Sequence, residues 1–153
     1  MGDPPRRRVN ADLAFGGSIL IADTSARMRT REPSGCDLWA AAVNADQIRT
    51  CSMVTMEILY SARDAHDVAE TEKIDAQLRQ IPVTASVQRA AIGAIRELAQ
   101  QGAGAHRIPP PDILIAAAAQ EAGVGVLHYD RHYDRLAEVL NFEGVWIAPP
   151  GSL

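Results

Sequence analysis

The chain has 153 residues and a formal net charge of −4 at pH 7. This length suits one compact domain that buries roughly 70% of its unfolded surface, and it gives no reason to expect two domains. The acidic balance argues against a protein that coats nucleic acid non-specifically, although a local cationic strip is compatible with it. The two cysteines stand outside any CxxC motif and are expected to be free thiols of a reducing compartment.

The N-terminal segment lacks the pattern of an export signal. Three arginines at positions 6–8 precede VNADLAF, which is too short and too polar for the apolar core of a signal peptide. No run of 18 apolar residues occurs, so no membrane span is expected. We therefore expect a flexible tail over residues 1–17, a single domain over residues 18–153 and a cytoplasmic protein.

From residue 18 onwards, short apolar runs alternate with helical patterns. An arginine-rich loop is expected over 27–32, and Pro82 assigns one short strand to a sheet edge. Strands are predicted over 18–23, 47–53, 80–83, 124–127 and 144–148. Helices are predicted over 34–44, 54–63, 64–78, 84–101, 112–122 and 130–140, with caps at Asp64, Gly102 and Gly123. The alternation predicts an α/β sandwich with a mainly parallel sheet and right-handed crossovers.

Carboxylates recur where such a fold binds ligands, at the carboxyl ends of the strands. Asp23 follows the first strand, Glu57 lies in the helix after the second, and Asp112 begins the most apolar helix. Asp130 and Asp134 follow the fourth strand. Taken singly, the last four could be helix caps or solvated side chains. A buried Asp23 without a partner would cost several kcal/mol, and convergence of all these positions favours a site.

Clustered carboxylates repel one another, so such a site needs protons or a cation. Oxygen ligands without a cysteine partner suit Mg²⁺ or Mn²⁺. One or two such ions can activate a water molecule and stabilise the leaving oxygen during phosphodiester hydrolysis.

Four segments carry a family resemblance: ILIADTSA, VTMEILYSAR, PPPDILIAAAA and LHYDRHYDRLAEV. In this order, with acids 34, 55 and 18 residues apart, they resemble PIN-domain ribonucleases, and more narrowly the VapC toxins of bacterial toxin–antitoxin pairs. The resemblance covers about residues 18–148 and implies a PIN-like three-layer sandwich. The long N-terminal tail departs from the family but affects no site residue.

The resemblance implies the site residues. The family's catalytic and metal-binding quartet falls on Asp23, Glu57, Asp112 and Asp130, and Ser25 matches the hydroxyl that accompanies the first acid. Asp134 could assist through water. Arg131 would lie near a substrate phosphate, and further candidate RNA contacts are Arg27, Arg29, Arg31 and Arg63.

The implied activity is that of a Mg²⁺-dependent endoribonuclease, in which Mn²⁺ could substitute, leaving 5′-phosphate and 3′-hydroxyl ends. The implied partners are RNA, a second copy of the chain and a small VapB-like antitoxin that covers a groove near the first helices. Apolar candidates for that groove are Leu38, Trp39, Val43, Met53, Met56, Leu59 and Tyr60.

The repeat HYDRHYDR leaves its two histidines, His128 and His132, without an assigned role. Four residues apart, they could bind zinc on a helix, but no cysteine or third histidine is near, which favours packing or RNA contact.

Other functional classes fit less well. A phospho-receiver domain needs a lysine at a late strand end, but the one lysine, Lys73, falls in a mid-chain helix. A haloacid-dehalogenase-type phosphatase needs an aspartate where Ser25 stands, and DTSARM lacks the glycines of a dinucleotide-binding loop. The remaining alternative is a catalytically inactive PIN-like module that binds RNA or protein.

Overall fold

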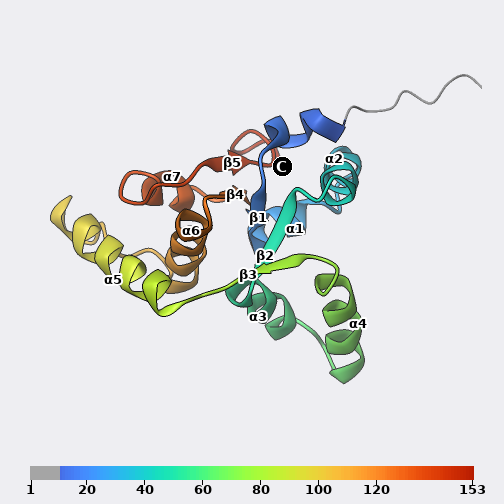
Figure 1. Ribbon diagram of the computed structural model, residues 1–153, viewed down its shortest axis with the longest axis horizontal. Coiled ribbons are helices and arrows are strands. Elements are labelled where there is room, and N and C mark those ends of the chain that lie inside the picture. Colours follow the sequence, from blue (N-terminus) through green and yellow to red (C-terminus); the bar gives the residue numbers. More distant parts are fainter. Residues whose placement is uncertain (1–10) are drawn as a thin grey trace, which may run out of the picture.

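The computed structural model describes residues 11–153 and builds them around a parallel sheet of five strands (Figure 1). Every neighbouring pair of strands is parallel, and the order is β3-β2-β1-β4-β5. The strands are β1 (Leu20–Ala22), β2 (Ile48–Cys51), β3 (Arg79–Ile81), β4 (Gly125–His128) and β5 (Gly144–Trp146). The predicted α/β class is confirmed, as is the edge position of the strand that precedes Pro82.

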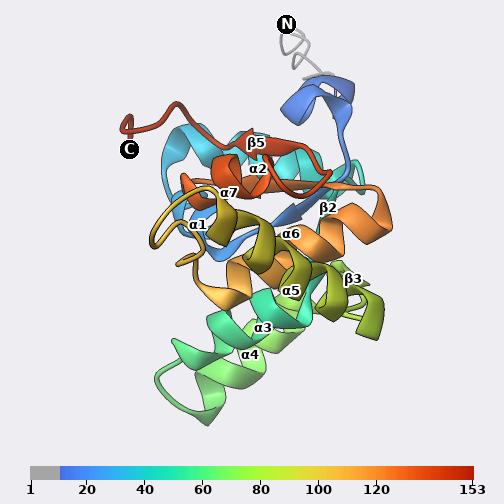
Figure 2. The same ribbon diagram turned by 90° about the vertical axis from the view of Figure 1, so that its left-hand side faces the viewer.

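Helices cover both faces of this sheet, which gives the three-layer arrangement. Figure 2 views the face on which α5, α6 and α7 lie, while α1 and α2 lie behind the strands. The helices are α1 (Thr24–Arg29), α2 (Pro33–Asn44), α3 (Ser52–Tyr60), α4 (Ala65–Asp75), α5 (Ala85–Gln100), α6 (Pro110–Ala122) and α7 (His132–Leu136). In residues 11–153, none of these helices has the length and apolar character that a membrane span requires.

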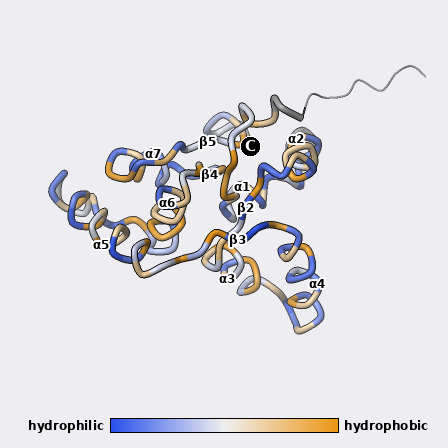
Figure 3. Tube along the Cα trace, viewed as in Figure 1, coloured by the Kyte–Doolittle hydropathy of each residue, from blue (hydrophilic) through white to orange (hydrophobic). Residues whose placement is uncertain are grey.

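The central strand β1 is buried on both faces, and it is among the most apolar parts of the trace in Figure 3. Its side chains alternate between two cores, as a strand requires. Ile21 packs with α5 and α6 residues, whereas Leu20 and Ala22 pack with Ala26 and Ala42 on the opposite face. This two-sided burial explains why the sequence of the strand is uniformly apolar.

Several helix ends follow the local signals in the sequence. The Asp64 carboxylate accepts a hydrogen bond from the Asp67 backbone N–H and caps α4, and the Thr84 hydroxyl caps α5 in the same way. Gly123 ends α6 with φ of +67°, a left-handed conformation that glycine adopts without strain.

Two predicted segments differ from the structure near the acidic residues. The expected loop over 27–32 begins as helix α1, because the Asp23 side chain caps that helix through the Ser25 N–H. The helix expected over 130–140 is only α7, five residues long, and the chain continues in turns through Val139. Predicted strands 18–23, 47–53 and 144–148 are each shorter by two residues or more.

The predicted N-terminal tail divides into two parts. Residues 1–10 lie outside the described residues. Residues 11–17 form two short 3₁₀ turns joined by a kink over residues 14–16. At this kink Ala14 is 2% exposed, and its carbonyl accepts a 3.1 Å hydrogen bond from the Gln47 side chain. The fold therefore begins before residue 18, because this segment covers the β1–β2 side of the second core.

The strand order places a switch point between β1 and β4. From β1 the chain adds β2 and β3 on one side, and later β4 and β5 on the other. Crossovers leave β1 and β4 in opposite directions, so the loops after these strands diverge and leave space at their carboxyl ends. Asp23 follows β1 there, and Tyr129 and Asp130 follow β4.

Candidate metal centre

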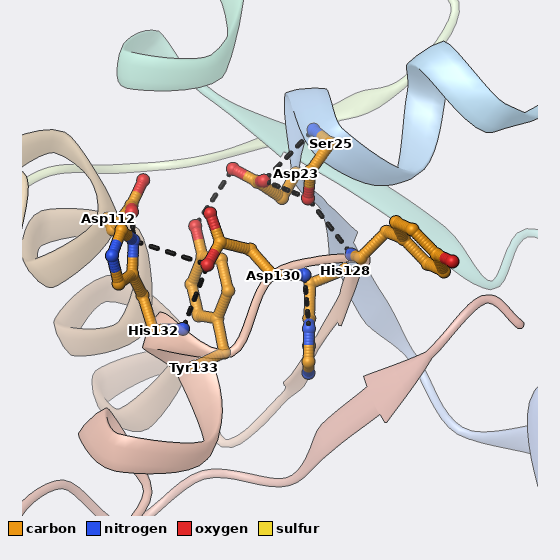
Figure 4. Close-up of polar contacts among 8 residues, drawn as sticks. Asp23, Ser25, Asp112, His128, Asp130, His132 and Tyr133 are labelled. Atoms are coloured by element: carbon orange, nitrogen blue, oxygen red, sulfur yellow. Dashed lines mark hydrogen bonds and ion pairs between the residues drawn. The ribbon is translucent and has the colours of Figure 1, made fainter. Parts of the chain in front are cut away.

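Asp23 is held at the end of β1 by three hydrogen bonds from neutral groups. One carboxylate oxygen accepts from the Ser25 backbone N–H at 3.0 Å and from the Ser25 hydroxyl at 2.5 Å. The other accepts from the Tyr133 hydroxyl at 2.8 Å (Figure 4). The side chain is 4% exposed. These neutral donors fix the orientation of the buried Asp23 carboxylate, and no lysine or arginine within residues 11–153 forms an ion pair with it.

Ser25 also joins the two strand ends. Its hydroxyl oxygen accepts a 3.0 Å hydrogen bond from the Tyr129 backbone N–H, which lies 104 residues away in the loop after β4. Ser25, the serine of the sequence DTS, therefore links the Asp23 carboxylate to the loop that follows β4.

Asp112 lies in the first turn of α6, directly after the three prolines, and is 9% exposed. Pro109 occupies the N-cap position, so Asp112 is not the helix cap. Burial, which is the largest cause, and the charges of Asp23 and Asp130 together raise the pKa of the Asp112 carboxyl to about 6, against the lowering effect of His132. The carboxylates therefore lie close enough to oppose one another's ionisation.

Asp130 and His132 complete a compact group with Asp112. The His132 Nδ1 atom is 2.9 Å from an Asp112 oxygen and 3.3 Å from an Asp130 oxygen, and the His132 backbone N–H donates to Asp130 at 2.9 Å. One ligand atom from each of these three side chains lies within 4.8 Å of the others. Figure 4 shows the three side chains facing one another from α6 and the β4–α7 segment.

Tyr133 and His128 form the buried floor beside this group. Tyr133 is fully buried, and burial together with the Asp23 charge holds its pKa well above the usual value, so its hydroxyl stays a donor. His128 packs between Tyr133 and Trp146, with ring centroids 5.0 and 4.9 Å away. Its Nδ1 accepts from the Asp130 backbone N–H at 3.2 Å, and burial lowers its pKa. Packing, one of the two roles favoured for this histidine, is the one it has.

The remaining predicted acids lie around the centre. Glu57 reaches the start of α1 from α3, where its carboxylate accepts from the Thr24 hydroxyl at 2.8 Å. Asp134 is exposed and accepts a 3.0 Å hydrogen bond from the Trp146 indole N–H, and it does not belong to the group of possible ligands around Asp112.

The five candidate arginines occupy different surroundings. Arg27 forms a 2.6 Å ion pair with Asp75, and Arg63 binds Asp67 with two nitrogens at the far end of α3. Arg29 stacks 4.6 Å from the centre of the Tyr129 ring. Arg31 and Arg131 are exposed.

Sequence reasoning missed the roles of His132, Tyr133 and the Arg27–Asp75 pair. The group of Asp112, Asp130 and His132 combines two carboxylates with an imidazole, a donor set that fits one divalent cation. A cation at this position would offset both the burial and the repulsion that raise the pKa of Asp112.

A groove of about 400 Å³ is lined mainly by residues of α1, α2 and α4. Trp39 and Val43, two of the seven apolar candidates, line it together with Thr24 and Arg27. Three other candidates, Met53, Met56 and Tyr60, line a second hollow of about 310 Å³ with Glu57 and Pro111. Tyr60 is 92% exposed.

Comparisons with known proteins agree with this architecture. The PIN domain family model matches residues 19–139. Ribonuclease VapC18 of Mycobacterium tuberculosis (strain ATCC 25618 / H37Rv) is 41% identical over 137 residues, covering 88% of this chain and 99% of that protein. Ribonuclease VapC51 of the same strain is 32% identical over 133 residues, covering 87% and 96%.

Solved structures share the fold. The DNA-bound VapBC from Salmonella typhimurium superimposes with a TM-score of 0.68 at 18% identity, covering 84% of this chain and 98% of that one. VapBC-5 from Mycobacterium tuberculosis gives 0.60 at 20% identity, covering 83% and 97%. At such identities the likeness shows the fold alone. The family match and the sequence relatives together show that this chain belongs to the PIN-domain family, in its VapC ribonuclease branch.

Proposed function

We propose that the protein is a divalent-metal-dependent endoribonuclease toxin that hydrolyses RNA phosphodiester bonds and is silenced by a VapB-like antitoxin. The observation that carries the proposal is the convergence of Asp23, Asp112 and Asp130, delivered by three separate elements, with the pKa of Asp112 raised to about 6. A protein that only binds partners gains nothing from holding three repelling carboxylates together.

The chain's own residues hold and orient the centre. Asp112 and Asp130 would hold the cation, Mg²⁺ with Mn²⁺ as a substitute, and Asp23 and Glu57 complete its acidic surroundings. Ser25 and Tyr133 fix the Asp23 carboxylate by hydrogen bonds. The cation supplies a lowered water pKa and stabilisation of the charge that develops on the phosphate. No histidine is needed as general base, and the ends produced would be 5′-phosphate and 3′-hydroxyl.

Substrate contacts are proposed at the exposed arginines beside the centre. Arg131 follows Asp130 directly and is exposed, and Arg31 is exposed beyond α1. Arg29 lies over the Tyr129 ring next to the same loop, so a base or phosphate could be bound there. Arg27 and Arg63 are engaged by carboxylates, which makes them weaker candidates.

RNA cleavage by the purified full chain tests the proposal. We would incubate total bacterial RNA with Mg²⁺, Mn²⁺ or EDTA, include Asp23→Asn, and sequence the new 5′ ends. Discrete cuts with 5′-phosphate ends, absent with EDTA and with the variant, are expected. A folded, antitoxin-free chain that binds RNA but cuts none with either metal would instead identify the alternative, a PIN-like binding module.

The antitoxin is proposed to lie in the groove lined by α1, α2 and α4. Trp39 and Val43 supply apolar contact, and Arg27 adds buried Nε and Nη2 atoms that have no hydrogen-bond partner within residues 11–153. A segment with an apolar face and a carbonyl or carboxylate would satisfy both features. The structural neighbours are VapBC assemblies, which supports this class of partner.

Co-purification with the small protein of the neighbouring gene tests the groove. Trp39→Ala should weaken the complex by at least about 10-fold, because buried aromatic side chains dominate interface energies. Ile92→Ala, at an exposed position of α5, is the matched control and should bind normally. Equal loss in both variants would contradict the assignment.

We also propose that the protein forms a homodimer and is located in the cytoplasm. Mass measurement in solution tests the first proposal, and cell fractionation tests the second.

A further inference from the structure

The acidic centre contains a nitrogen donor that an oxygen-only magnesium site would not need. His132 is the first residue of α7, two positions after Asp130. Its Nδ1 atom faces both carboxylates, 2.9 Å from Asp112 and 3.3 Å from Asp130. The backbone N–H of the same residue binds Asp130, so the ring and the carboxylate are held in one rigid turn.

The two distances from Nδ1 to the carboxylates match the spacing of neighbouring ligands on one ion. Metal–ligand bonds of about 2.0–2.1 Å in octahedral geometry separate neighbouring ligand atoms by about 3 Å. The Nδ1 distances of 2.9 and 3.3 Å bracket this value, and all three atoms lie within 4.8 Å of one another. A cation can therefore replace the proton between His132 and Asp112 with little movement of the side chains.

The chemistry of the donor set points to a particular class of ion. Mg²⁺ takes oxygen ligands and keeps several waters, whereas first-row transition ions also accept imidazole nitrogen. Among these, Mn²⁺ best tolerates carboxylate and water oxygen. We propose that His132 ligates, through Nδ1, the same ion that Asp112 and Asp130 hold, and that it makes this centre prefer Mn²⁺ to Mg²⁺.

This inference rests on the proposed metal-dependent function, adds a nitrogen ligand to its metal centre, and places Mn²⁺ before Mg²⁺ in the order of preference given there. The competing explanation is that His132 only donates a hydrogen bond to Asp112 and never contacts the ion. The two differ in one observable, because a directly bound imidazole nitrogen couples magnetically to Mn²⁺ and a hydrogen-bonded one does not.

Two variants and one control separate these explanations. His132→Asp converts the group to oxygen donors only, and His132→Asn removes the imidazole at similar volume. His66→Asn removes an exposed histidine of α4 and is the matched control. We would bind Mn²⁺ to each metal-free full chain, record pulsed electron paramagnetic resonance for nitrogen coupling, and measure Mn²⁺ and Mg²⁺ affinities by calorimetry.

The expected result is nitrogen coupling in the wild-type chain and His66→Asn, and its loss in both His132 variants. The ratio of Mn²⁺ to Mg²⁺ affinity should fall by at least about 10-fold in His132→Asp, since loss of even an indirect ligand partner costs 10- to 100-fold. Bound Mn²⁺ without nitrogen coupling, or an unchanged ratio, would overturn the inference.

RNA cleavage, measured in parallel, separates this inference from the proposed function. Mg²⁺-dependent cleavage without nitrogen coupling overturns the role of His132 and leaves the nuclease. Nitrogen-coupled Mn²⁺ without cleavage supports the ligand and overturns the nuclease. A folded wild-type chain that binds neither ion overturns both.

Discussion

Two buried aspartates lie near the same short helix and have opposite surroundings. Asp75, at the end of α4, receives the Arg27 guanidinium at 2.6 Å and the Thr55 hydroxyl at 2.5 Å. Asp23, at the start of α1, receives only neutral donors among the described residues. Both residues are equally buried, at 4% exposure. The comparison separates a carboxylate that is neutralised within the fold from one that only neutral groups orient, as the proposed metal centre requires.

Removing the carboxylate charge at Asp23 tests whether this aspartate is needed for RNA cleavage. We expect this variant to show the largest effect of those proposed here. Asp23→Asn keeps the shape and the cap of α1 but removes charge from the metal centre. RNA cleavage should fall by more than about 100-fold, beyond the usual loss for an indirect ligand partner, while thermal unfolding changes little. Activity within 10-fold of the wild type, measured on the same RNA, would show that Asp23 is not part of the centre.

The structural side is tested by removing one partner of the Arg27–Asp75 pair. The two side chains are only 14% and 5% exposed, so Asp75→Asn leaves a buried guanidinium without its counter-charge. We expect a loss of about 3–5 kcal/mol in the free energy of unfolding, measured in urea. Arg27→Met combined with Asp75→Leu should recover much of it. A change below about 1 kcal/mol in the single variant would show that the pair contributes little.

The burial of Asp112 and its repulsion by the neighbouring acids of the proposed metal centre predict that one site mutation increases stability. The pKa of Asp112 rises from 3.8 to about 6 on folding. Folding therefore favours the protonated form, and the wild-type chain should lose up to about 3 kcal/mol of stability as pH rises from 4 to 6. In EDTA at pH 7, Asp112→Asn should be more stable than the wild type, and the difference should vanish below pH 4. Unfolding measured across this range would contradict the prediction if the variant were the less stable chain at pH 7.

Substitution of Tyr133 tests how much its hydrogen bond to Asp23, the aspartate without an ion-pair partner among the described residues, contributes to stability and activity. Tyr133→Phe removes one buried hydrogen bond to a carboxylate and leaves the ring packing against His128 and Phe142. We expect a loss of about 1.5–3 kcal/mol in stability. The kcat for RNA cleavage should fall with little change in KM, because the hydroxyl orients Asp23 and does not touch RNA. A change in KM alone would contradict this positioning role.

The smallest expected effect is a difference in chemical reactivity between the two cysteines, which are both free thiols. Cys36 is exposed, whereas Cys51 is buried at the end of β2 and burial raises the pKa of its thiol. Native protein treated with iodoacetamide should be modified at Cys36 first, because the thiolate is the reactive form. Mass spectrometry of the intact and unfolded chains distinguishes one modification from two. Equal labelling of both thiols in native protein would show that β2 opens readily.

Local sequence patterns determined much of the molecule. The cap at Asp64 and the end of α6 at Gly123 depend on neighbours within a few residues, and the structure has them where the sequence predicts. The alternation of apolar runs with helical patterns was enough for the α/β class. Strand ends and the length of α7 were predicted less well, because tertiary contacts decide where a short element stops.

Tertiary structure alone decided which side chains meet. The contacts of His132 with Asp112, Arg27 with Asp75 and Tyr133 with Asp23 span 20, 48 and 110 residues. No local pattern specifies such pairs, since they depend on how the strand order packs the helices and loops against one another, as where β1 and β4 bring Asp23 to Tyr133. The sequence by itself therefore determined the acids that converge and their order along the chain. Only the fold decided which acid is neutralised by an arginine and which remains available to a metal, because that depends on the partner that packing places within 3 Å.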